Sequence, residues 1–149
     1  MSDQLTLRER ANLQLVALAS AGCFEEAESL ALQLSQQECK VFHHFGPGFC
    51  IREMHIPAGT FVIGHAHKQA LANSFVQGHI RLWQNGVWEE LKAPMFFVGK
   101  PGRKCAIAIT DCIWQNIIAT NETDVQAIEN LFVVKSDNWK AAHAAKELT

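Results

Sequence analysis

Residues 57–78 read PAGTFVIGHAHKQALANSFVQG, and a turn followed by an alternating run with two histidines decides the fold class. The stretch opens with a Pro-Ala-Gly turn, and apolar side chains alternate after it. In an extended strand this alternation would place Phe61, Ile63, His65 and His67 on one face. Two imidazoles two residues apart then lie side by side, which suits one metal ion. Such a pair is also typical of histidines that bond to neighbouring groups or face water.

Short β-like runs broken by Gly and Pro extend over residues 40–120. The pair Asn85-Gly86 between two apolar runs indicates a β-hairpin. The pair Pro101-Gly102 indicates another turn. Strands at this spacing, with no helical pattern among them, favour a sandwich or a barrel. We therefore expect a closed or nearly closed antiparallel barrel with the histidine pair pointing inside.

Residues 6–36 have a helical pattern instead. Thr6 and Glu9 match a capping box, and Gly22 is a plausible end of the first helix. The two predicted helices form a hairpin whose apolar stripes must be buried against the barrel or another subunit. The first stripe consists of Leu7, Ala11, Leu15 and Leu18, and the second of Phe24, Ala27, Leu30, Ala31 and Leu34.

The C-terminal part returns to helical patterns. Residues 121–132 predict a short helix with Thr123 as its N-cap, FVV predicts one more strand, and residues 138–149 a frayed helix. The chain thus divides into a helical hairpin extension, residues 1–38, and a barrel with a C-terminal helix and tail, residues 39–149. The predicted fold class is mainly β.

Composition excludes several classes of function. The 149 residues carry a net charge of −2 and a pI near 6.4, so no basic nucleic-acid footprint is present. No apolar run approaches the roughly 18 residues of a membrane span, and the first ten residues lack the apolar stretch of a signal peptide. Five cysteines without a C-x-x-C pair favour reduced thiols. We expect a cytoplasmic protein that binds neither nucleic acid nor membrane.

The stretch at 57–78 resembles the first motif of the cupin superfamily: a Pro-x-Gly turn, five residues, H-x-H and a closing glycine. Residues 99–111, GKPGRKCAIAITD, resemble the second motif. The resemblance implies a cupin-type barrel, which is a double-stranded β-helix or jelly roll, with a metal in it. This chain departs from the family pattern twice. The acidic ligand is missing near Leu71 or Ala72, and Cys105 stands where the family usually has a histidine.

A thiolate can replace an imidazole at a metal. His65, His67 and Cys105 could therefore form a three-ligand site with an open position for a divalent ion such as zinc, iron, nickel or manganese. The missing carboxylate argues against the facial triad of iron oxygenases.

Residues 42–130 also resemble small cupin-like proteins encoded by tailed bacteriophages, most specifically in HHF-x-PG-x-x-x-RE and TNETD. A phage origin would place the protein in the host cytoplasm. Those relatives often carry one histidine near Leu71 and another near Ile118, and this chain has lost both. Either the metal site has moved to His65 and Cys105, or metal binding has been lost.

Four further residues are candidates for ligand contact. His79 opens a strand, although that position is more typical of a surface histidine. His43 could lie at the barrel mouth or simply cap a strand end. Arg52 and the residue after it fall on opposite strand faces, so one of them could point inward with a partner. Trp114 could stack on a ligand or pack the barrel.

Two functions remain open. In the first, the barrel binds a small polar ligand, either directly or through a metal. In the second, the chain is a non-enzymatic interaction module that binds a host or virion protein through the barrel edge and the helical hairpin. Catalysis is assigned to neither. A homodimer is expected, since two-fold dimers are the commonest oligomers and the helical stripes need cover.

Overall fold

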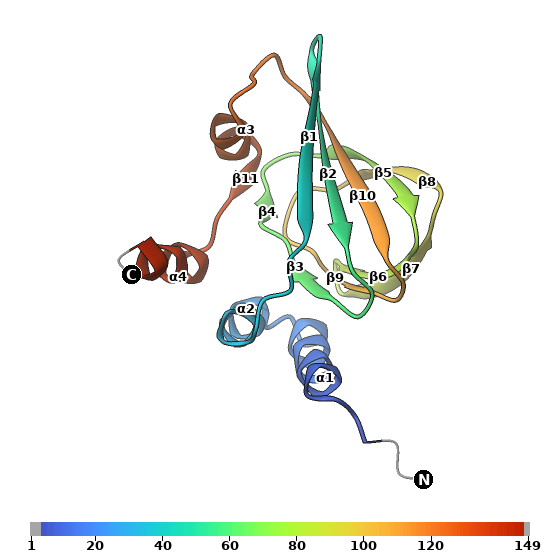
Figure 1. The fold of residues 1–149 in the computed structure, drawn as a ribbon, viewed down its shortest axis with the longest axis vertical. Coiled ribbons are helices and arrows are strands. Elements are labelled where there is room, and N and C mark those ends of the chain that lie inside the picture. Colours follow the sequence, from blue (N-terminus) through green and yellow to red (C-terminus); the bar gives the residue numbers. More distant parts are fainter. Residues whose placement is uncertain (1–3, 148–149) are drawn as a thin grey trace.

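The computed structural model describes residues 4–147, which form a β-barrel with two helices at each end of the chain (Figure 1). The helices are α1 (Leu7–Ser20), α2 (Phe24–Gln33), α3 (Val125–Phe132) and α4 (Asp137–Glu147). The strands are β1 (Lys40–Gly46), β2 (Phe49–Ile56), β3 (Phe61–Ile63), β4 (Ala66–His67), β5 (Leu71–Gln77), β6 (His79–Gln84), β7 (Val87–Lys92), β8 (Met95–Gly99), β9 (Cys105–Ala108), β10 (Cys112–Ala119) and β11 (Val133–Val134).

Two antiparallel sheets form the barrel. Sheet A has the order β1-β2-β10-β5-β8, and sheet B has the order β3-β9-β6-β7. Between β2 and β10 the chain passes repeatedly from one sheet to the other, so that strands far apart in sequence become neighbours. This is the strand order of a jelly roll, in which both sheets wind into a double-stranded β-helix. The predicted fold class is confirmed.

The turns form where the sequence indicates them. Asn85 and Gly86 have φ angles of 53° and 81° and join β6 to β7 as a two-residue hairpin. Gly78 has a φ of 102°, and a Cβ on it would lie 2.4 Å from the carbonyl oxygen of Asp111. Glycine is therefore required at the end of β5 for two reasons, backbone conformation and space.

The predicted continuous strand around the histidine pair is interrupted. Gly64 and His65 belong to no strand, and β3 and β4 on either side pair with different partners, β9 and β11. The alternation of side chains does not continue through this break. Phe61 packs under the helical hairpin, Ile63 contacts both the hairpin and the cavity described below, and His65 and His67 border that cavity with their rings directed apart. The prediction of one shared face for all four side chains is wrong for this reason.

The helical hairpin lies on the outer face of sheet B. Ala19, Trp83 and Cys105 form a buried cluster with Phe24, Phe61, Ile63 and Trp88 packed against it; we call this set the hairpin cluster. The Trp88 indole donates a 2.8 Å hydrogen bond to Ser20, and Asn12 donates one of 2.8 Å to the Gly59 carbonyl. The barrel therefore covers the hairpin within the same chain.

The start of α1 confirms the capping box, since Thr6 and Glu9 exchange hydrogen bonds of 2.7 and 3.1 Å. The predicted stripe of α1 is only partly right. Leu15 is buried and Ala11 and Leu18 are half-buried, but Leu7 is 84% exposed because the helix begins beyond the edge of the sheet it packs against. Ala19, which lies outside the predicted stripe, is also buried.

The C-terminal segment crosses one end of the barrel (Figure 1). Asp124, and not the predicted Thr123, caps α3, since its carboxylate accepts from the Gln126 amide. Val133–Val134 form the predicted extra strand and pair with β4. Lys68, next to β4, donates to the carbonyls of Phe132 and Asn130 at 2.9 and 2.7 Å. These contacts fix α3 over the barrel end.

One buried carboxylate ties the parts of the chain together. Glu28 on α2 is 5% exposed and accepts hydrogen bonds from Arg103, in the β8–β9 turn, and from Ser136, before α4. All five cysteines are free. Among residues 4–147, no helix is long and apolar enough to cross a membrane.

Candidate ligand-binding cavity

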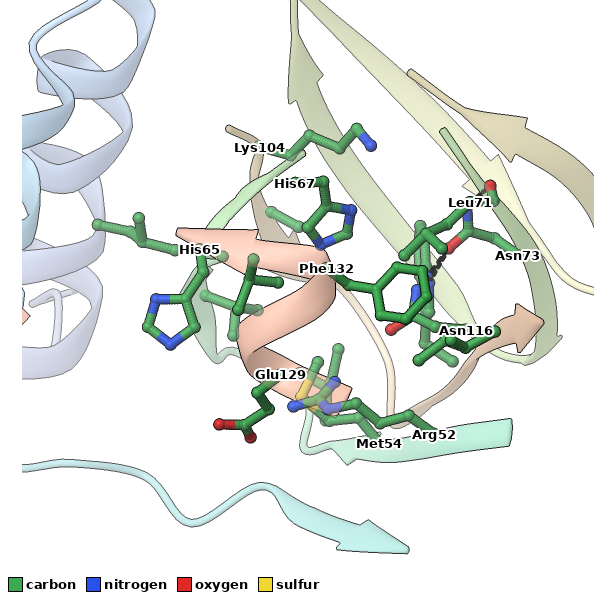
Figure 2. Close-up of a pocket in the computed structure, with 18 of the residues that line it drawn as sticks. Arg52, Met54, His65, His67, Leu71, Asn73, Lys104, Asn116, Glu129 and Phe132 are labelled. Carbon is green, nitrogen blue, oxygen red and sulfur yellow. Dashed lines mark hydrogen bonds between the residues drawn. The ribbon is translucent and has the colours of Figure 1, made fainter. Parts of the chain in front are cut away.

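The barrel contains a partly open cavity of about 350 Å³ (Figure 2). Its inner end is apolar and is lined by Met54, Ile56, Ile80, Leu82 and Ala106. Its outer end is bordered by an apolar layer of Leu71, Ile118, Ile128 and Phe132, the last two from α3. Leu71 and Ile118 are the two positions at which the resemblance to phage proteins implied histidines. A packed apolar layer occupies them here.

Between these apolar ends lies a row of polar side chains across sheet A, which we call the polar belt. It consists of His43, Arg52, Asn116 and Asn73, which are direct partners on β1, β2, β10 and β5. Partners directly opposite in antiparallel strands have Cβ atoms about 4.5–5.5 Å apart and face the same side. All four line the cavity. The jelly-roll order therefore assembles the belt from four strands spread over residues 43–116.

Hydrogen bonds fix the orientation of the two amides in the belt. The Trp114 indole N–H can only donate, and the Asn73 atom it meets at 3.0 Å is therefore the oxygen Oδ1. The Asn116 atom 2.6 Å from the same oxygen must then be Nδ2. Asn73 donates in turn to the Leu71 carbonyl at 3.0 Å. As a result, Asn116 keeps its own Oδ1 free as an acceptor beside Arg52.

Arg52 brings a positive charge into the cavity wall. Burial lowers the pKa of its guanidinium, and the nearby Glu129 on α3 partly offsets this. Glu129 itself forms a 2.9 Å ion pair with Lys135. None of the ion pairs among the described residues includes Arg52. Burying a guanidinium without a carboxylate partner costs folding free energy. A ligand that supplies a carboxylate would offset this cost.

Lys104 and His67 line the opposite side of the cavity from Arg52 (Figure 2). The Lys104 ammonium donates to the Lys100 carbonyl at 2.9 Å, and burial lowers its pKa. Burial, followed by the charges of Lys104 and Arg52, lowers the pKa of His67 to about 4. His67 is thus a neutral imidazole at neutral pH, able to donate or accept one hydrogen bond, while the two cations keep the cavity positive.

The three predicted metal ligands do not converge. The His65 ring points away from His67 (Figure 2) and meets Trp139 of α4 edge-on, with ring centroids 5.2 Å apart. Cys105 borders the cavity as part of β9, but its side chain belongs to the hairpin cluster. The alternate residues Ala106 and Ala108 are the ones that face the barrel core. All three residues border the cavity, but the His65 ring is directed away from the His67 ring and the Cys105 side chain packs in the hairpin cluster.

The chemistry of the donors also fits a metal poorly. Burial raises the pKa of the Cys105 thiol to about 12, so a metal would have to displace its proton from an apolar site that lacks a second converging ligand. Within residues 4–147, no group of three His, Cys, Asp or Glu side chains could hold a metal ion. The ligand set predicted for a divalent metal does not fit this structure.

The four predicted ligand contacts separate into two groups. His43, Arg52 and Trp114 line the cavity. His79 does not: its backbone amide bonds to Thr110, and its imidazole lies 3.8 Å from Glu90 on β7, outside the barrel. Trp114 is 9% exposed and packs between Phe75 and Phe97, so only part of its indole reaches the cavity.

Sequence reasoning missed Asn73, Asn116 and Lys104. A pattern for the first two was present, because single polar residues stand between apolar residues at spacing two in three strands: Cys50-Arg52-Met54, Leu71-Asn73-Phe75 and Trp114-Asn116-Ile118. In a strand with an apolar inner face, such an interruption indicates a polar group facing the core. No comparable pattern marks Lys104.

No protein-family model and no curated protein sequence matches this chain. Solved structures of similar shape include a protein with a double-stranded β-helix domain from Klebsiella pneumoniae. It is 18% identical, the alignment covers 68% of this chain and 90% of the Klebsiella chain, and the TM-score is 0.49. A Cupin_2 domain of an XRE family transcriptional regulator from Enterobacter cloacae is 12% identical, and the alignment covers 58% of this chain and 100% of the domain, with a TM-score of 0.48. The Cnp3 cupin domain of Schizosaccharomyces pombe is 19% identical, and the alignment covers 64% of this chain and 72% of the Cnp3 chain, with a TM-score of 0.47.

Likenesses this distant carry no conclusion about activity, and none supports the predicted bacteriophage origin, which stays a prediction. The strand order is the stronger observation. By that order the chain has a cupin-type double-stranded β-helix fold, and its function follows from its own cavity.

Proposed function

We propose that the barrel binds a small polar molecule directly, without a metal. The observation that carries this proposal is the polar belt, which lies between two apolar layers inside the barrel. A cavity of about 350 Å³ is at the small end of the roughly 300–1,000 Å³ range of ligand sites. An apolar wall with a few convergent polar groups is the usual composition of such sites.

The state of the polar groups supports the proposal. A belt that served stability alone would satisfy its own hydrogen bonds, as Asn73 does with Trp114, Asn116 and Leu71. Arg52 and the free oxygen of Asn116 are not satisfied in this way. They offer a strong donor and an acceptor side by side, which is the arrangement that a polar ligand completes.

Nuclear magnetic resonance tests this function. The indole N–H of Trp114 and the side-chain amides of Asn73 and Asn116 report on the belt. We expect their resonances to shift when the protein is titrated with members of a panel of amino acids, hydroxy acids, sugars and nucleosides. Asn116→Leu should abolish the response of Trp114. Gln115→Leu changes the neighbouring side chain, which points out of the barrel, and should preserve it. A panel that shifts none of these resonances contradicts the proposal.

A second candidate function, association with another copy of the chain, is favoured by the outer face of sheet A. Phe42, Phe96 and Val98 are 43%, 63% and 65% exposed on it. Its carboxylate, Glu53, lies within 3.7 Å of His44 and 2.8 Å of His55. Both oxygens of this carboxylate are hydrogen-bonded within the chain, one to His55 and the other, at 2.7 Å, to Gln115, so a two-fold contact on this face leaves neither oxygen without a partner. The helical hairpin, by contrast, has its apolar cluster covered by its own barrel.

A further inference from the structure

The cations and anions around the cavity are unequal in number. Arg52 and Lys104 line it as cations, and Glu129 is the carboxylate among its described lining residues. Glu129 already pairs with Lys135. His67 is neutral, so it does not change the balance. The cavity therefore has an excess of positive charge that nothing in the described part of the chain neutralises, and a bound anion would do so.

The two cations are not equivalent. Lys104 already donates to the Lys100 carbonyl, and its ammonium is hemmed in beside Gly99, where an added Cβ would meet Nζ at 2.8 Å. Arg52 lies on the opposite side of His67 (Figure 2), next to the free acceptor of Asn116. Its planar guanidinium matches a carboxylate with two parallel hydrogen bonds, which an ammonium cannot do. Arg52 is therefore the better anchor for an anion.

The surroundings of Arg52 indicate what the anion is attached to. The next inward position on β2 is Met54, and Ile80, Leu82 and Ala106 line the same inner end of the cavity. A molecule anchored at Arg52 would extend into this apolar end. Such a surface matches a short hydrocarbon or aromatic body and offers few donors to a second charged group.

We propose that the cavity binds a small organic acid, with its carboxylate on Arg52 beside Asn116 and its apolar body against Met54, Ile80 and Leu82. This proposal rests on the proposed function and names the class of ligand. Lys104, at the other side of His67, contributes positive potential but no direct contact with the carboxylate.

Isothermal titration calorimetry with matched acids and amides tests the proposal. The acids are acetate, butyrate, isovalerate and benzoate, and the neutral controls are acetamide, butyramide, isovaleramide and benzamide. We expect each acid to bind at least tenfold more tightly than its amide. From acetate to butyrate, affinity should rise by about fourfold per CH₂ buried. Inorganic phosphate should bind more weakly than butyrate, and equal or tighter binding of phosphate overturns the assignment to a carboxylate.

Variants locate the anchor. Arg52→Met should weaken butyrate binding by about tenfold to a hundredfold, and Arg52→Lys, which keeps the charge but loses the fork, by less. Lys104→Met should cost only about twofold to threefold, as expected of a charge acting at a distance. Arg8→Met, an exposed arginine on α1, is the control and should bind as wild type. If Arg52→Met does not fold, Arg52→Lys carries the comparison.

The outcomes separate this inference from the proposed function. If acids and amides bind equally, or if Lys104→Met costs more than Arg52→Met, the carboxylate assignment is wrong while a polar ligand still occupies the barrel. If sugars or nucleosides bind at the belt and no acid does, the carboxylate assignment is likewise wrong and the proposed function stands. If nothing in either panel binds at millimolar concentration, both proposals fail.

Discussion

The Trp114 indole donates a 3.0 Å hydrogen bond to Oδ1 of Asn73, and both side chains are buried, at 9% and 3% exposure. Asn116 donates to the same oxygen. One amide on β5 therefore sets the orientation of two side chains on β10. Asn73 is a positioning residue for the cavity: it holds Trp114 and Asn116 in place, and its oxygen has no further capacity for a ligand.

Replacing Asn73 with Ala should destabilise the barrel and disorder the belt. The indole and Asn116 would each lose their buried acceptor, at a cost of about 1–3 kcal/mol for each unsatisfied group. Urea denaturation should show a loss in the free energy of unfolding of at least about 2 kcal/mol. Ser74→Ala, the next residue on the outer face of β5, is the matched control and should stay within about 0.5 kcal/mol of wild type. Equal stabilities for the two variants would contradict the role given to Asn73.

Gly99→Ala should disturb the Lys104 side of the cavity. A Cβ at this position would lie 2.8 Å from both Asn73 Nδ2 and Lys104 Nζ. The lysine can move aside, but the amide is held by three hydrogen bonds. We expect a loss of roughly 1–3 kcal/mol in the free energy of unfolding and a changed chemical shift for the Trp114 indole. Gly64→Ala is the control: its Cβ would meet only the Lys104 carbonyl at 3.5 Å, so stability and the Trp114 shift should stay as in wild type. A wild-type spectrum for Gly99→Ala would contradict this prediction.

Acidification should destabilise the protein between about pH 6.5 and pH 4. Burial, Lys104 and Arg52 lower the pKa of His67 from 6.5 to about 4 in the folded state. The unfolded chain therefore takes up this proton first as the pH falls, and the free energy of unfolding decreases through this window. Burial lowers the pKa of His43 and His65 as well. Urea denaturation at pH 7 and pH 5 should show a smaller pH effect for His67→Gln than for the exposed control His44→Gln.

Removing the Cys105 thiol should leave metal affinity unchanged. Its side chain lies in the hairpin cluster, and its pKa is raised to about 12. Titration of zinc into wild type and Cys105→Ala should give the same affinity, and a tenfold loss would show that the thiol reaches the metal after all. A second measurement is alkylation of the native protein with iodoacetamide. The half-buried Cys23 should react while Cys105, which is 2% exposed, stays unmodified, because the reagent has to reach the sulfur atom.

The homodimer stays a prediction, and the outer face of sheet A is where it can be tested. Light scattering at tens of micromolar, a concentration well above that of a nanomolar complex, should report a dimer. Phe96→Asp should convert it to a monomer, because a charge would be buried in the apolar contact. Val87→Asp places the same change on sheet B, at a residue that is 56% exposed, and should leave the dimer intact. A wild-type monomer would overturn the prediction.

Much of the fold could be predicted because its determinants are local. The Asn85-Gly86 turn has left-handed φ angles that few other residue pairs adopt, and the capping box depends on residues three apart. Alternation along β2, β5 and β10 gives the inner face of each strand. The resemblance to two cupin motifs added the order in which the strands wind. These features agree with one another, which is what specifies a single fold.

The site was harder to predict because its determinants are not local. The break at Gly64 and His65 changes which face the following residues point to, and no periodicity reveals it. Cys105 matches the position of a ligand in the motif, yet the helical hairpin covers the face on which its side chain lies. The polar belt depends on the register of four strands, whereas the sequence shows only that each strand has one polar interruption. Joining them requires the three-dimensional structure.

The strand β10 lies between β2 and β5 in sheet A, although it is the last of the three along the chain. During synthesis on the ribosome, Arg52 and Asn73 leave the exit tunnel long before Asn116 does. Until β10 inserts, the facing edges of β2 and β5 stay open to pairing with other chains. The barrel therefore closes late, through contacts between distant residues that form slowly. Lower temperature and slower translation during expression should favour soluble product, since they give β10 time to fill its place before the open edges meet.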